Sequence, residues 1–207
     1  MSNPSAEGAV KVADTTANPA PLGLLGFGMT TVLLNLHNAG VYPLNSAIMG
    51  MGIFVGGLAQ VIAGVQEWKK NNTFGATAFT AYGFFWMALV AIWTLPKLGG
   101  IANPSGELDM GFFLGMWGLF TLGMFFGTLR LNRMLQTVFG SLTLLFFGLA
   151  LRDFLGAAGS EAASHAVGLA SGWIGLFCGF SAFYGSLAQV LNEVYGKVVL
   201  PLGPVKK

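Results

Sequence analysis

Few side chains in this sequence could do chemistry, and most of those that could are polar and uncharged. Between residues 27 and 38, five side chains recur at the spacing of one helix face, namely Phe27, Thr30, Thr31, Leu34 and Asn38. Gln60 and Tyr82 lie in the apolar stretches that follow. Hydroxyl and amide groups in such surroundings either bond to one another between packed helices or line a pathway for a small polar solute.

The sequence offers no evident set of residues for catalysis or for metal binding. Cys178 is the single cysteine and has no evident histidine partner, and His37 and His165 lack the spacing of metal ligands. We therefore predict a protein that is not an enzyme and that needs neither a metal nor a cofactor. His37 is a candidate pH gate, and the alternative is a histidine that bonds to a neighbouring carbonyl.

The segment from Asn18 to Pro21 predicts a rigid helix start. Asn18 is expected to cap the helix, and Pro19 is expected to be its first residue. Because neither Pro19 nor Pro21 has an N–H group, the amide of Ala20 is the one that the Asn18 side chain can reach. A helix start carries partial positive charge, so it attracts carboxylates.

The elements that position these residues must lie in a lipid bilayer. Of the 207 residues, 54% are hydrophobic and 9% are charged, whereas about 25% of the residues of a soluble domain are charged. The formal net charge of +2, with no basic run, argues against a nucleic-acid partner. Residues 15–66 carry no charge, and this stretch exceeds twice the roughly 20 residues that cross a bilayer. It must therefore fold back on itself.

The spacing of charged and apolar residues along the rest of the chain predicts an all-α integral membrane protein. The six predicted transmembrane helices cover residues 19–40, 45–66, 74–95, 109–129, 134–151 and 165–192. They form a membrane domain over residues 18–195, between an N-terminal extension (1–17) and a tail (196–207). In this interpretation no acidic residue lies in the interior of a span, since Asp109 is the first residue of its helix, and all eight prolines lie at or beyond the helix ends.

The basic residues predict the orientation. Eight Lys and Arg residues fall on the face that carries both termini and two, Lys97 and Arg152, on the other face. The positive-inside rule then places both termini in the cytoplasm of a multi-pass protein of the plasma or inner membrane. Because residues 1–17 have no apolar segment, we expect no cleavable signal peptide.

Pairs of glycines four residues apart recur in the predicted helices, and they include Gly52 and Gly56, Gly111 and Gly115, Gly123 and Gly127, Gly168 and Gly172, and Gly175 and Gly179. Such pairs let helix backbones approach closely in lipid. They either pack the helices of one protomer or join protomers into a ring.

The start of the first predicted helix is similar to the motif of a known family. Asn-Pro-Ala-Pro-Leu-Gly-Leu at residues 18–24, continued by Gly26 to Thr31, resembles the signature of the acetate uptake transporter (AceTr) family of acetate and succinate permeases. Further matching segments lie at residues 34–40, 72–75, 125–129, 172–175 and 190–193. The resemblance covers residues 18 to about 203.

The resemblance implies a hexamer of six-helix protomers, each with its own pore for acetate and similar small carboxylates. The family's hydrophobic constriction carries over to Phe27, Tyr82 and Leu142, and its size-selecting small residue on the last helix to Ala182. Asn18 belongs to the family motif, and Thr31 and Gln60 are our further candidates for the pathway.

The residues of the predicted pathway are compatible with two mechanisms. The pathway is either channel-like with no proton relay, or the proton travels on the acid itself. A pH-gated urea or amide channel is the alternative function, since it shares the size and composition of this chain but not the motif at residues 18–24.

Overall fold

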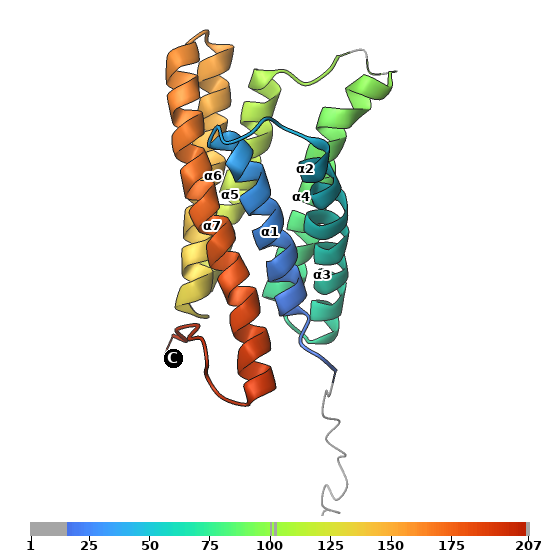
Figure 1. Cartoon of the computed structure of the whole chain (residues 1–207), viewed down its shortest axis with the longest axis vertical. Coiled ribbons are helices and arrows are strands. Elements are labelled where there is room, and N and C mark those ends of the chain that lie inside the picture. The colour runs from blue at the N-terminus through green and yellow to red at the C-terminus, as the bar shows by residue number, and fades with distance from the viewer. Residues whose placement is uncertain (1–15, 100, 102, 206–207) are drawn as a thin grey trace, which may run out of the picture.

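The computed structural model describes residues 16–99, 101 and 103–205, and these form a bundle of membrane-length helices (Figure 1). Six helical segments are long and apolar enough to cross a bilayer, one of them assembled from α2, η1 and α3 without a break. The elements are α1 (Ala20–Asn38), α2 (Ser46–Gly50), the π-helix η1 (Met51–Ala59), α3 (Gln60–Lys69), α4 (Thr73–Leu98), α5 (Glu107–Thr128), α6 (Arg133–Ala157) and α7 (Glu161–Tyr195). The prediction of an all-α multi-pass membrane protein is confirmed.

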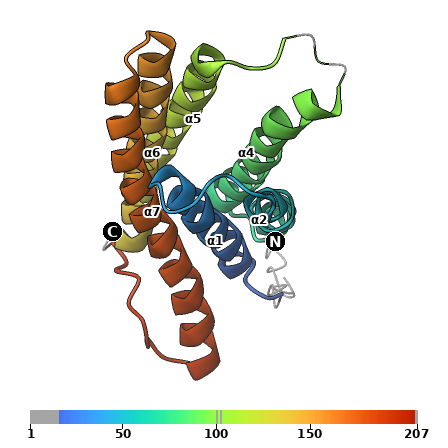
Figure 2. The ribbon, with the colours of Figure 1, turned by 45° about the horizontal axis from the view of Figure 1, so that its top comes forward.

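The helices form two groups with α1 between them (Figure 1). On one side α6 packs between α5 and α7, while on the other side the helix made of α2, η1 and α3 packs on α4. α1 lies in extensive contact with α7 and also touches η1 and α3. α4 and α5, although consecutive, diverge toward the loop that joins them and scarcely touch (Figure 2). The backbones of α4 and α5 therefore do not close the space between these two helices, and side chains line it instead.

Glycines occupy the positions where the backbones of neighbouring helices approach each other most closely. A Cβ atom on Gly28 of α1 would lie 2.7 Å from the amide nitrogen of Phe183 and 2.8 Å from the carbonyl oxygen of Gly179 on α7. Close approach of α1 and α7 therefore requires glycine at this position. Gly115 and Gly123 of α5 differ, because nothing lies within 4 Å of a Cβ atom placed there. Glycine pairs thus pack α1 on α7 within the protomer, whereas part of the α5 series stays uncovered.

Two helices are longer than the sequence predicted. α6 continues to Ala157 and α7 begins at Glu161, so the predicted loop of residues 152–164 shrinks to residues 158–160. Polar residues there suggested a loop, but a helix of 35 residues is about 52 Å long and extends well beyond the ~30 Å hydrocarbon layer. The first turns of α7 can therefore lie outside the hydrocarbon layer, where charged side chains are tolerated.

Two expectations about the spans were wrong. Glu67 and Asp153 lie within the membrane-length helices that end at Lys69 and Ala157, so acidic residues do occur there. Pro96 lies inside the last turn of α4 rather than beyond its end. The loss of one hydrogen bond from a terminal turn is tolerated because helix ends carry unpaired carbonyls in any case.

Candidate transport pathway

Two cavities lie at opposite ends of the bundle. Cavity A, of about 740 Å³, is at the end where α1 begins and α3 finishes, and Asn18, Lys70 and Arg130 are among its lining residues. Cavity B, of about 500 Å³, is at the end where α1 finishes, and its lining includes Asn38 and Arg152. Phe27 and Leu142 line both cavities. The two hollows therefore approach each other at these two side chains.

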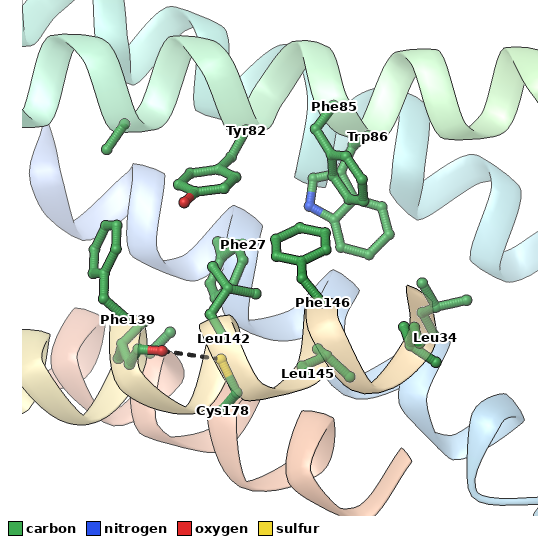
Figure 3. Close-up of a cluster of buried hydrophobic side chains, with 14 of the residues drawn as sticks. Phe27, Leu34, Tyr82, Phe85, Trp86, Phe139, Leu142, Leu145, Phe146 and Cys178 are labelled. Atoms are coloured by element: carbon green, nitrogen blue, oxygen red, sulfur yellow. Dashed lines mark hydrogen bonds between the residues drawn. The ribbon is translucent and has the colours of Figure 1, made fainter. Parts of the chain in front are cut away.

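Buried side chains from α1, α4 and α6 cluster where the two cavities meet (Figure 3). Tyr82 from α4 and Leu142 from α6 point toward each other, and the ring of Phe27 from α1 lies 6.0 Å from that of Tyr82. All three side chains are buried in one core cluster. The tertiary structure thus brings together, from three helices, the residues that the family resemblance assigned to the constriction.

The hydroxyl group of Tyr82 is already engaged. It lies 2.8 Å from Oγ1 of Thr121, and Thr121 donates its own hydroxyl proton to the carbonyl oxygen of Trp117 at 2.7 Å. Both contacts are satisfied only when Tyr82 is the donor to Thr121. At the constriction, therefore, the Tyr82 oxygen offers lone pairs rather than a proton.

Three buried polar atoms flank the constriction without a hydrogen-bond partner in the described part of the chain, namely Thr31 Oγ1, Gln60 Oε1 and Trp86 Nε1. Thr31 and Trp86 line cavity B, each one helical turn beyond Phe27 and Tyr82 respectively, and Gln60 lines cavity A. An unpartnered buried polar group costs about 1–3 kcal/mol. These atoms are therefore ready to bind a solute or water.

Trp86 was missed by the sequence reasoning. Its position four residues after Tyr82 on the same helix face was the available signal, but an indole in an apolar helix is far more common as a packing residue. Figure 3 shows its ring between α4 and α6, close to the constriction residues.

Asn18 occupies the mouth of cavity A. Its Oδ1 accepts a hydrogen bond from the Ala20 amide at 3.1 Å, as predicted, and its Nδ2 donates to Gln189 of α7 at 3.1 Å. The first residue of α1 is Ala20, one position later than expected, with Pro19 as the capping residue. Asn18 thus ties the start of α1 to α7 beside the cavity.

Ala182 and His37 differ in their relation to the pathway. Ala182 is fully buried in α7 and is not among the residues that line either cavity. Its role in size selection stays a prediction. His37 lines cavity B, and its Nδ1 lies 3.1 Å from the carbonyl oxygen of Tyr42, which is the contact expected of a histidine that bonds to a neighbouring carbonyl.

The chain after α7 also reaches the pathway, and the sequence did not suggest this. The amide of Arg133 donates to the carbonyl oxygen of Gly203 at 2.8 Å, and the amide of Val205 donates to that of Leu131 at 3.0 Å. Asn192 holds the intervening segment through Leu200 and its neighbour. As a result Val205 lines cavity A, and the tail forms part of the wall there.

The arrangement of six spans with an apolar ring between two cavities can be compared with known proteins. A family model described as the GPR1/FUN34/yaaH family matches residues 3–206. This chain belongs to the GPR1/FUN34/yaaH family. The family membership predicted from the motif at residues 18–24 is thereby confirmed.

Several members and one solved structure are close to the chain. It is 57% identical over 187 residues to the succinate-acetate/proton symporter SatP of Escherichia coli, covering 90% of this chain and 95% of that protein. Acetate permease A of Emericella nidulans is 32% identical over 200 residues, covering 90% of this chain and 65% of that protein. The structure of the bacterial acetate channel SatP matches with a TM-score of 0.84 at 55% identity, covering 91% of this chain and all of that one.

Proposed function

We propose that this member of the GPR1/FUN34/yaaH family carries acetate and related small carboxylates, succinate among them, across the membrane. The observation that carries the proposal is the pair of cavities that share Phe27 and Leu142. Relatives named for acetate and succinate transport support it. The proposal assigns the chain no catalysis, because those relatives are named for transport.

The constriction suits a two-carbon acid. Apolar walls from Phe27 and Leu142 can hold its methyl group, while the hydroxyl of Thr31 and the indole N–H of Trp86 can donate to its carboxyl oxygens in cavity B. Gln60 supplies an amide on the other side. Selection then depends on the width of the apolar ring and on the donors beside it.

The test is uptake of labelled acetate into liposomes that contain the purified protein, with and without an imposed proton gradient. Empty liposomes correct for acid that crosses the lipid unaided, and labelled succinate, which carries two carboxyl groups, provides a less permeant substrate. Acetate uptake above that of empty liposomes is expected. Urea uptake without acetate uptake would instead favour the urea or amide channel.

We propose further that protomers assemble into a hexameric ring with one pathway each. α5 is the least buried of the six membrane-length helices, and Gly115 and Gly123 on it have nothing packed on them. Gly123→Trp is expected to break the assembly if α5 packs on a neighbouring protomer. A native mass of about six protomers for the parent chain, and a smaller mass for the variant, is the expected outcome.

We also propose that both chain ends face the cytoplasm of a cell with a plasma or inner membrane. Most of the described basic residues lie at the cavity A end, namely Lys69, Lys70, Arg130, Arg133 and Lys197, whereas Lys97 and Arg152 lie at the other end. A tag at either end should resist protease added outside spheroplasts. Cleavage of the tag in intact spheroplasts would mean that the chain ends face the outside of the cell.

A further inference from the structure

Two acidic side chains lie buried at opposite ends of the pathway, one in each cavity. Asp153 in cavity B is 5% exposed, and Glu67 in cavity A is 2% exposed. Each has one carboxyl oxygen without a hydrogen-bond partner among the residues described, Oδ2 of Asp153 and Oε1 of Glu67. A carboxylate in such a position is costly, so each group is suited to bind a proton.

Around Asp153, one cation faces two carboxyl groups. Nε and Nη2 of Arg152 each lie 2.6 Å from Oδ1 of Asp153. The carboxylate of Glu107 from α5 lies against Gly156 of α6, since a Cβ atom there would be 2.6 Å from its Oε1. His37 from α1 is the remaining titratable side chain that lines cavity B. The acidic pair with Arg152 is therefore neutral when one carboxyl group holds a proton.

Glu67 is held at the other end by the turn that follows α3. The side-chain amide of Asn72 donates to Oε2 of Glu67 at 2.7 Å, and Gly75 leaves space for the carboxyl group, since a Cβ atom there would be 2.9 Å from its Cδ. The other charged side chains lining cavity A are Lys70, Arg130 and Glu193. Oε1 of Glu67 remains available for a proton carried by a solute.

The constriction between these groups is unsuited to an anion. Phe27 and Leu142 have no polar atoms in their side chains, and Tyr82 uses its proton on Thr121. An ion that leaves water for such surroundings loses several kcal/mol of hydration energy, whereas a protonated acid does not. A protonated acid can also donate its O–H to the Tyr82 oxygen.

We propose that Asp153 and Glu67 load and unload the proton of the transported acid, so that the acid crosses the constriction neutral. In cavity B the O–H bond of protonated Asp153 breaks, and a new O–H bond forms on the substrate carboxylate. The Asp153 carboxylate then regains a proton from water on that side. In cavity A the acid returns its proton to the Glu67 carboxylate, which releases it to water. One carboxylate and one proton cross together, and the steps reverse for the opposite flux. This inference rests on the proposed transport of small carboxylates.

The test compares Asp153→Asn with the parent protein in liposomes at about pH 7 and about pH 5 on the cavity B side. At about pH 7 acetate is almost entirely anionic and needs a proton from the protein, whereas at about pH 5 much of it already carries one. We expect Asp153→Asn to lower acetate uptake about 10-fold at the higher pH and less than about 2-fold at the lower pH. Asp153→Glu should regain most of the loss, and Glu161→Gln, at an exposed acid on the same face, should behave as the parent.

Other outcomes overturn the proposal. Equal uptake by Asp153→Asn and the parent at both pH values would mean that the acid takes its proton from bulk water, and an equal loss at both would mean a structural role. If Asp153→Asn does not purify as the parent does, Glu67→Gln decides by the same criteria, with efflux measured and the pH varied on the cavity A side. Absence of uptake by the parent protein itself would instead refute the proposed function.

Discussion

Leu142→Ala removes the side chain that both cavities share, so it tests the apolar constriction directly. The side chain is 3% exposed in the core cluster, and such a truncation costs about 2–5 kcal/mol of stability. We expect the lower end of that range, because the two cavities can admit water. An apolar site distinguishes two ligands that differ by one carbon group by about 1–3 kcal/mol. Losing the wall at Leu142 should therefore raise uptake of lactate relative to acetate by about 10-fold or more.

The assay is uptake of labelled lactate and labelled acetate into liposomes, expressed as the ratio of initial rates after subtraction of empty liposomes. Leu145→Ala is the matched control, since Leu145 is similarly buried on the same helix but lines cavity B alone. It should lower stability by a similar amount and leave the ratio unchanged. An unchanged ratio in Leu142→Ala, or an equal rise in both variants, would refute the assignment of the constriction.

Three further predictions concern packing, the tail and pH. Gly28→Ala forces a Cβ atom against α7, so it should lower the stability by about 2 kcal/mol and the Tm by about 4–8 °C. Gly123→Ala is the control and should hardly change the Tm. Equal Tm shifts in the two variants would contradict the packing of α1 on α7. Asn192→Ala loses three hydrogen bonds to the tail, so a protease should cleave the tail faster than in the parent. An unchanged cleavage rate would mean that contacts other than those of Asn192 hold the tail. His37→Gln should keep the pH profile of uptake, since Nδ1 of His37 contacts the Tyr42 carbonyl; a displaced profile would restore the pH-gate hypothesis.

Much of the fold could be predicted from the sequence. The lengths of the apolar stretches and the places of the charged residues predicted six spans, and the residues that the structure describes form six helices of membrane length. The ends of α6 and α7 could not be predicted in the same way, because polar residues at the bilayer surface are compatible with either a loop or a longer helix. That ambiguity hid Asp153, which the sequence placed in a loop and the structure buries in α6.

The pathway was only partly accessible from the sequence. Phe27, Tyr82 and Leu142 were named through family resemblance, and no local pattern indicates that they meet. The direction of the Tyr82 hydrogen bond depends on Thr121, which is 39 residues away in the chain. The unpartnered indole of Trp86 likewise becomes visible only when its surroundings are known.

The sequence by itself determined that this chain spans a bilayer and how often, because hydration of charges and apolar surface is a local property of each segment. It also determined the family, through its motifs. Tertiary structure alone decided which side chains close the pathway, which polar atoms are left unpaired and which carboxyl groups are buried. Those properties arise from contacts between residues that are distant in the chain and that only helix packing brings together.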